Sequence, residues 1–288
     1  MSRGPTAYDV TTVERAAAGR RLRLPRGPHR GRVGEVRASS AGSALELHDF
    51  RGYHPGDDLR HVDWNAAARL GELVIRVRQD EVSPRVEVVL DATRSMGVEP
   101  EKAARALEIA AWVLLLAQRG GLETTVLTVG RASGRALGVA GFTLLERTQM
   151  DGEEAFDVGL GRSTVLRPCG LRVVVSDFLL EASPVALTER LARGAAGLAL
   201  VQVLGAEDLQ PLAGGQRLID SETGEAIERL VTPEALESYA TRLSAHVALW
   251  ESAARRARAS WAAIAAPTPL EGLARGALGF LVDPQGAR

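Results

Sequence analysis

The sequence predicts an α/β fold in which a doubly wound, mostly parallel sheet carries helices on both faces. Short apolar strands alternate with helical segments from position 86 onward. The strands consist mainly of apolar residues, as buried parallel strands do. A segment with strand-like alternation precedes this region, and a long amphipathic pattern follows it. We therefore expect an N-terminal β-rich extension, the α/β domain and a long C-terminal helix.

The elements of the sheet follow one another in a regular order. Val86–Leu90 is the first expected strand. Pro100–Arg119 is expected to be a helix, because proline suits the first turn and Gly120 suits the end. The second half of this helix is apolar nearly all round, which predicts burial. Further strands and helices are expected at Thr124–Val129, Leu171–Ser176, Pro184–Arg193 and Leu198–Leu204.

The last third of the chain has a different pattern. Arg217–Asp220 and Glu225–Leu230 flank a Ser-Glu-Thr-Gly turn, which predicts a hairpin. Apolar residues then recur every three or four positions, at Leu236, Tyr239, Leu243, Val247, Trp250, Ala254, Trp261 and Ile264. This spacing predicts one helix of about 30 residues, roughly 45 Å long, with a narrow apolar stripe. The stripe packs on its own domain or, alternatively, serves as a docking arm for a partner.

The N-terminal part is rich in arginine. The first 38 residues hold nine arginines against three acids, with Gly and Pro interspersed. They are expected to form a loose, solvated tail followed by irregular or strand structure; the alternative is a basic arm that binds nucleic acid or an acidic protein. The alternation over Leu73–Arg78 predicts a half-exposed strand. The expected parts are a tail (1–38), the extension (39–81), the α/β domain (82–265) and a C-terminal tail (266–288).

The overall composition narrows the classes of function. The chain has 35 basic and 36 acidic residues, a balance that argues against general coating of nucleic acid or membranes. Its longest apolar run, Ile109–Ala117, is about half the length of a membrane span. Cys169 is the single cysteine, so neither an internal disulfide nor a cysteine-rich metal site is expected. The N-terminus has no apolar signal core. These features predict a soluble, cytoplasmic protein for which nucleic acid is an unlikely partner.

The candidate site lies where the first strand ends. Asp91 closes an apolar run, and Thr93 and Ser95 follow at alternate positions. Carboxylate and hydroxyl oxygens suit Mg²⁺ or Mn²⁺ better than zinc or copper. Asp177 ends another strand; if the two strands are neighbours, it lies about 4.8 Å across the sheet from Asp91. We predict a metal site of Asp91, Thr93, Ser95 and Asp177; the alternative is a turn in which Asp91 or Thr93 caps the next helix.

The Asp-x-Thr-x-Ser pattern of Asp91, Thr93 and Ser95 resembles the metal-ion-dependent adhesion site of von Willebrand factor A domains, usually Asp-x-Ser-x-Ser. The resemblance implies a von Willebrand A-like strand order and adhesion through a metal rather than turnover. Such sites also use a loop threonine, often in a Gly-x-Thr setting. Thr148 and Thr164 are the nearest candidates, and neither lies in a convincing context, so weak metal affinity is expected.

A second resemblance rests on the segment from Leu47 to Arg69. It contains Asp-Phe-Arg-Gly-Tyr-His-Pro-Gly-Asp-Asp and, further on, Arg-His-Val-Asp-Trp. This segment resembles the signature of domain-of-unknown-function family 58 (DUF58), with signature residues Tyr53, Pro55, Gly56, Asp57, Asp58, Arg60, Asp63 and Trp64. The resemblance extends over about residues 40–260. It implies a bacterial-type, von Willebrand A-like protein in its short, soluble form, acting beside a MoxR-type AAA+ ATPase.

The resemblances imply a non-enzymatic protein-interaction module that acts with that ATPase in assembly or maturation of client proteins. The ionisable cluster of Asp57, Asp58, His61 and Asp63 invites a hydrolase interpretation. Structural roles are favoured instead. Asp57 or Asp58 caps the following turn, Asp63 pairs with a nearby arginine, and Trp64 anchors the segment in a core. The alternative from another class is a metal-dependent phosphohydrolase that uses Asp91 and the Gly-Asp-Asp acids.

Overall fold

The structure is a computed structural model that describes residues 8–25, 50–53, 62, 64–76, 85–163, 166–221 and 224–284. The chain divides into two units. The larger unit comprises Met1–Pro25 and Pro84–Arg288, and the smaller one comprises Arg26–Ser83. Each unit is described by itself.

The larger unit is built on a six-stranded sheet with the strand order β11-β8-β7-β4-β5-β6. All neighbouring strands are parallel except β6, which runs antiparallel to β5 at one edge. The strands are β4 (Val86–Ala92), β5 (Thr124–Gly130), β6 (Gly134–Leu137), β7 (Leu171–Ser176), β8 (Leu198–Leu204) and β11 (Ser260–Ala265). Strands β4, β7 and β8 are buried along their whole length, as their mainly apolar sequences predict.

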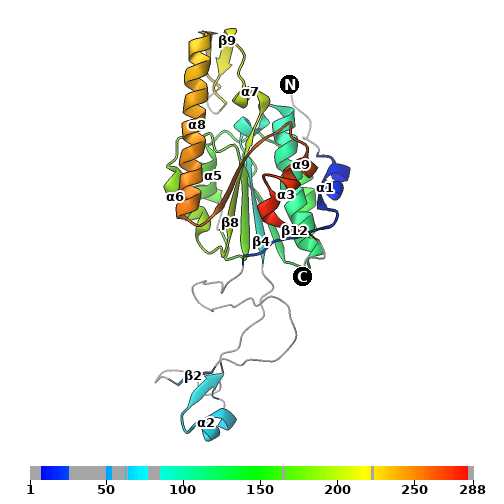
Figure 1. The fold of residues 1–288 in the computed structure, drawn as a ribbon, viewed down its shortest axis with the longest axis vertical. Coiled ribbons are helices and arrows are strands. Elements are labelled where there is room, and N and C mark those ends of the chain that lie inside the picture. Colours follow the sequence, from blue (N-terminus) through cyan, green and yellow to red (C-terminus); the bar gives the residue numbers. More distant parts are fainter. Residues whose placement is uncertain are drawn as a thin grey trace. The chain divides into compact units, whose positions relative to one another are not determined.

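Helices cover both faces of this sheet (Figure 1). One face carries α1 (Val10–Ala17), α3 (Pro100–Arg119), α4 (Ala140–Arg147) and α9 (Leu270–Arg275). The other carries α5 (Phe156–Ser163), α6 (Pro184–Ala192) and α8 (Pro233–Arg256). The predicted doubly wound α/β fold with a long C-terminal helix is therefore confirmed. The bounds of α3, β7 and β8 are those expected from the sequence.

A hairpin and part of a helix project beyond the carboxyl ends of the strands (Figure 1). The hairpin consists of β9 (Gly214–Ile219) and β10 (Ala226–Val231), which pair antiparallel as predicted. It follows α7 (Ala206–Leu209), a short helix directly after β8. All buried residues of α8 lie in its C-terminal half, at Trp250, Ala253 and Ala254. We call the hairpin together with the N-terminal half of α8 the arm.

The predicted 30-residue helix is shorter in the structure. Helix α8 ends at Arg256, and the chain reverses through Arg258, whose φ is +55°. Ser260–Ala265 then forms β11 and pairs in parallel with β8. Trp261 and Ile264 therefore belong to an edge strand rather than to the apolar stripe. The prediction was wrong here because residues that fit a helical period also complete the sheet, where they gain hydrogen bonds along β8.

Both ends of the larger unit are ordered where tails were expected. Val13, Ala16 and Ala17 of α1 are buried in the core that contains α3. Strand β1 (Arg20–Leu22) pairs antiparallel with β12 (Val282–Pro284), which follows a short 3₁₀ helix at Gly279–Leu281. The tail was expected because arginines dominate this region, whereas α1 has only three buried apolar residues. The strand that pairs with β1 is β12, which lies at the other end of the sequence.

The smaller unit contains a short antiparallel pair, β2 (Phe50–Gly52) and β3 (Val74–Arg76), and helix α2 (Trp64–Leu70). The Tyr53 amide donates to the Leu73 carbonyl at 2.8 Å. Trp64 is 63% exposed at the first position of the short helix α2, so the expectation that it anchors a core was wrong. Signature residues Pro55, Gly56, Asp57, Asp58, Arg60 and Asp63 lie outside the described residues, as do His61 and most of the arginine-rich segment.

Within the described ranges, none of the helices combines the length and the apolar character that crossing a membrane requires.

Candidate functional site

The two acids of the predicted site lie at neighbouring strand ends. Strands β4 and β7 are parallel and adjacent, with Leu90 opposite Val175. Asp91 is the second-last residue of β4, and Asp177 directly follows β7. The exposed fractions of the two residues are 1% and 2%. The sequence-based expectation of adjacent strands is thus confirmed. We call Asp91, Thr93, Ser95 and Asp177 the carboxyl edge.

Asp91 is held by hydrogen bonds on both oxygens. Its Oδ1 accepts from the Thr93 amide at 2.9 Å, and its Oδ2 accepts from the Ser176 hydroxyl at 2.6 Å. Burial, and after it the Asp177 carboxylate, raises the pKa of Asp91 to about 7, although the hydrogen bonds from Ser176 and Thr93 act in the opposite direction. Burial and the neighbouring acid therefore favour the protonated form of the Asp91 carboxyl.

The two hydroxyls of the carboxyl edge are close together. Thr93 precedes the 3₁₀ turn Arg94–Gly97, which brings the Ser95 Oγ to 3.0 Å from the Thr93 Oγ1. Two oxygens bound at right angles to an octahedral Mg²⁺, each about 2.1 Å from the ion, lie roughly 3 Å apart. The spacing of these hydroxyls therefore suits neighbouring positions on one small divalent ion.

The loop that follows α4 in the sequence lies against this turn. Gly152 pairs with Thr93, and the Arg94 amide donates to the Gly152 carbonyl at 2.9 Å. A Cβ at Gly152 would lie 2.8 Å from the Gly130 Cα, so only glycine permits this approach. The next residue, Glu153, forms an ion pair with Arg94 at 2.5 Å. The loop therefore brings a carboxylate, not a threonine, to this side of the turn.

The structure does not place either of the two threonines considered as loop ligands at the carboxyl edge. The Thr148 hydroxyl donates to the Leu144 carbonyl at 2.8 Å, at the end of α4. Thr164 lies outside the described residues.

Asp177 has a partner that the sequence analysis did not assign. Its Oδ2 lies 2.9 Å from the Lys102 Nζ, and its Oδ1 accepts from the Leu179 amide at 3.1 Å. Lys102 also pairs with Asp208 of α7 at 2.8 Å. Burial opposes the charged form of Lys102, but the two carboxylates outweigh it and raise the pKa of Lys102 above its usual value. The ammonium therefore stays charged in the interior.

A signal for Lys102 was present in the sequence. It is the only lysine among 35 basic residues, and it falls in the first turn of the helix that follows Asp91. Its link to Asp177 and Asp208 could not be seen, because both acids are far away in sequence.

The carboxyl edge fits a divalent cation in part. Asp91, Thr93 and Ser95 present oxygens of the right kind, and the two hydroxyls have a suitable spacing. Asp177 differs from Asp91 in that a cation already lies against it, the Lys102 ammonium at 2.9 Å from its Oδ2, so it does not fit the predicted role of metal ligand. In the part of the chain that the structure describes, no group of three or more His, Cys, Asp or Glu could hold a metal. An ion here would depend on hydroxyls and water.

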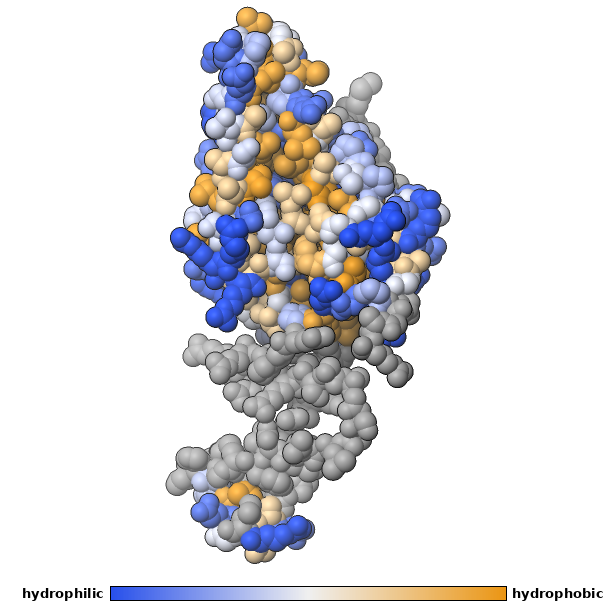
Figure 2. All heavy atoms as spheres, in the orientation of Figure 1, coloured by the Kyte–Doolittle hydropathy of each residue, from blue (hydrophilic) through white to orange (hydrophobic). Residues whose placement is uncertain are grey.

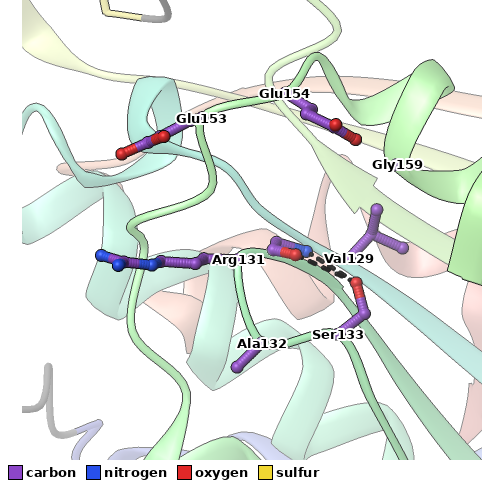
Figure 3. Close-up of a pocket in the computed structure, with 8 residues that line it drawn as sticks. Val129, Arg131, Ala132, Ser133, Glu153, Glu154 and Gly159 are labelled. Atoms are coloured by element: carbon purple, nitrogen blue, oxygen red, sulfur yellow. Dashed lines mark hydrogen bonds between the residues drawn. The ribbon is translucent and has the colours of Figure 1, made fainter.

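A pocket of about 510 Å³ lies beside the carboxyl edge, where β5 ends (Figure 3). Glu153 and Glu154 lie on one side of it, and Arg131 and Ser133 on the other (Figure 3). The Ser133 hydroxyl donates to the Gly130 carbonyl at 3.0 Å, and Glu154 pairs with Arg162. Its lining residues, as described, include no histidine or cysteine, and the hydroxyl of its serine is bonded to the backbone.

The fold and the site define a doubly wound α/β domain whose carboxyl edge combines buried acids with hydroxyls. Residues 49–138 match the family model described as "Protein of unknown function DUF58", which confirms the DUF58 resemblance over this segment. The match spans the signature and the first strands and helix of the sheet.

Two solved structures share weak similarity with the chain. The conserved hypothetical protein BatB from Bacteroides thetaiotaomicron is 12% identical, with a TM-score of 0.36 over 69% of this chain and 98% of that one. An aerotolerance-related membrane protein from Bacteroides fragilis NCTC 9343 is 15% identical, with a TM-score of 0.30 over 60% of this chain and 99% of that one. Comparison with curated proteins gives no match.

The raised pKa of Asp91 predicts a pH dependence of stability. Between the ordinary value of 3.8 and about 7, the folded state keeps a proton that the unfolded chain has released. The contribution of Asp91 to stability is therefore present at low pH and falls as pH rises through this window, by up to about 4 kcal/mol. Melting temperatures of wild type and Asp91→Asn at pH 5 and pH 8 test this. The wild type should lose stability relative to the variant at pH 8; parallel pH profiles would contradict the prediction.

Proposed function

We propose that the chain is a non-enzymatic protein-interaction module that acts with a MoxR-type AAA+ ATPase in assembly or maturation of client proteins. One observation carries the proposal. The carboxyl edge gathers buried acids and hydroxyls, and the Thr93 Oγ1 and the Ser95 Oγ lie 3.0 Å apart, a spacing that suits neighbouring ligands of one small divalent ion. Such an arrangement is suited to binding a ligand.

The arm supports an interaction role. It exposes large apolar side chains, among them Ile219 (60% exposed) and Leu230 (73%), and Leu212 just before it is 67% exposed. Figure 2 shows apolar surface at the tip of the arm. Neighbouring apolar side chains on a protein surface often mark a contact with another protein. The Tyr239 hydroxyl of α8 donates to the Asp208 carbonyl at 2.7 Å, so the arm is tied to the carboxyl edge through α7.

The proposal includes a divalent ion, Mg²⁺ or Mn²⁺. Asp91, Thr93 and Ser95 would hold it, and its remaining positions would be filled by water and by one carboxylate of the partner. When bound, the ion supplies a positive charge to which a partner carboxylate is attracted. The chain's own residues orient the oxygens: Ser176 and the Thr93 amide fix the Asp91 carboxylate.

An affinity-capture experiment tests the partner. The full chain is immobilised and offered the purified MoxR-type ATPase of the same genome, with magnesium or with a chelator. We expect capture by wild type and an approximately tenfold or greater loss with Leu230→Asp, because a charge on the apolar arm must be desolvated on contact. Leu137→Asp is the matched control, since Leu137 is 56% exposed on the edge strand β6. No capture by wild type, or equal capture by both variants, contradicts this interface.

A panel of phosphoesters with magnesium tests the absence of catalysis. We expect no turnover by wild type. Phosphoester hydrolysis that Asp91→Asn abolishes would replace the interaction module with a metal-dependent phosphohydrolase.

A further inference from the structure

Lys102 stands apart from every other basic residue of the chain. Of the 35 basic residues one is lysine, so the remaining 34 (35 − 1) are arginines. Arginine serves even in the core, where Arg172 is fully buried. A requirement for positive charge or for burial therefore does not by itself explain the lysine at position 102.

The geometry around Lys102 explains the choice of residue. Its Nζ lies 2.9 Å from Asp177 Oδ2 and 2.8 Å from Asp208 Oδ2, and the side chain is 2% exposed. These two carboxylates come from different elements and approach the same nitrogen. An ammonium is a compact charge with donors in three directions, whereas a guanidinium is flat, wider and strongly directional. The space between Asp177 and Asp208 therefore suits an ion-like group.

We propose that the Lys102 ammonium is the resident cation of the carboxyl edge and holds the place on Asp177 that a divalent ion would otherwise take. Asp177 is then a lysine ligand rather than a metal ligand. A divalent ion in the wild type would have only Asp91, Thr93 and Ser95 from the chain, and the ammonium would repel it. This inference concerns the site alone and does not depend on the partner named above.

Removing the ammonium should expose a stronger divalent site. Lys102→Met keeps most of the length of the side chain but leaves Asp177 and Asp208 without their shared cation. We expect this variant to bind Mn²⁺ about tenfold or more tightly than wild type in calorimetry, and to melt at a higher temperature when Mn²⁺ is added. Lys102→Arg, which retains the charge, should show no such gain.

A double variant shows whether a gain in Mn²⁺ affinity comes from Asp177 acting as a ligand or only from the loss of one positive charge. Lys102→Met with Asp177→Asn has the same net charge as wild type and lacks the freed Asp177 carboxylate, whereas Asp208 remains without its cation as in the single variant. Its Mn²⁺ affinity should return to the wild-type value. If Asp177 already binds the metal in wild type, this double variant instead binds more weakly than wild type.

The outcomes that overturn the proposal are specific. Equal Mn²⁺ affinity of wild type and Lys102→Met contradicts it, and so does a double variant weaker than wild type. If Lys102→Met does not fold in a chelator, its recovery with millimolar Mn²⁺ supports the proposal. Failure to recover with Mn²⁺, while the double variant folds, contradicts it.

Discussion

Replacing Arg172 with methionine should destabilise the protein by about 3–5 kcal/mol, because it leaves the Glu87 carboxylate uncompensated in the core. Both side chains are fully buried, and the Arg172 Nε lies 2.6 Å from Glu87 Oε2. Arg135 is 3.9 Å from Glu87 and lies nearer the surface, so it does not replace the lost partner. For a domain of this size the melting temperature should fall by roughly 6–20 °C.

Two further variants show where this cost arises. Arg172 also donates to backbone carbonyls of Leu191, Arg193 and Arg167, which fix the chain around β7. Glu87→Gln leaves the Arg172 guanidinium without its carboxylate but keeps its bonds to these carbonyls, so it should cost less than Arg172→Met. The double variant Glu87→Gln/Arg172→Met should recover part of the loss of Arg172→Met. If it recovers nothing, the carbonyl hydrogen bonds and not the unpaired charge account for the loss.

Replacing Trp250 with alanine should cost about 3–5 kcal/mol, because it empties the centre of the aromatic cluster under α8. Trp250 is fully buried, its ring lies 4.7 Å from that of Phe178, and it stacks on Trp261 at 6.2 Å. Thermal melting, with an expected fall of roughly 6–20 °C, measures the effect.

The cluster also supports the carboxyl edge. Phe178 directly follows Asp177 and has a φ of +51°, a backbone conformation that its packing must hold. The His246 Nε2 lies 2.7 Å from the Phe178 carbonyl oxygen and 3.0 Å from the Trp250 Nε1. Leu249→Ala is the matched control, because Leu249 is 60% exposed, and it should change stability by no more than about 0.5 kcal/mol. A Trp250 variant as stable as this control would show that the cluster does not hold Phe178.

Predictions from the sequence succeeded where a local pattern had one structural outcome. The mainly apolar strands β7 and β8 and the helix α3 were placed at their observed bounds. The pattern over positions 236–264 had two outcomes, since Trp261 and Ile264 suit both a helix stripe and a buried strand face. The structure resolves it through pairing of β11 with β8, which no local pattern specifies.

For the candidate site, too, the sequence predicted some features and not others. The Asp-x-Thr-x-Ser spacing indicated that oxygens would gather after β4, and the strand ending at Asp177 indicated the second acid. The partners of these groups could not be predicted: Ser176 on Asp91, Glu153 beside Arg94, and Lys102 on Asp177. Each contact joins residues at least 59 positions apart.

By itself, the sequence determined the alternation of strands and helices, the family signature and the kinds of chemical group at the strand ends, because periodicity and residue type act over a few neighbouring positions. Only the tertiary structure decided which cation faces Asp177. That choice depends on α3, β7 and α7 meeting at Lys102, where burial makes one unpaired charge costly and a nearby ammonium stabilising.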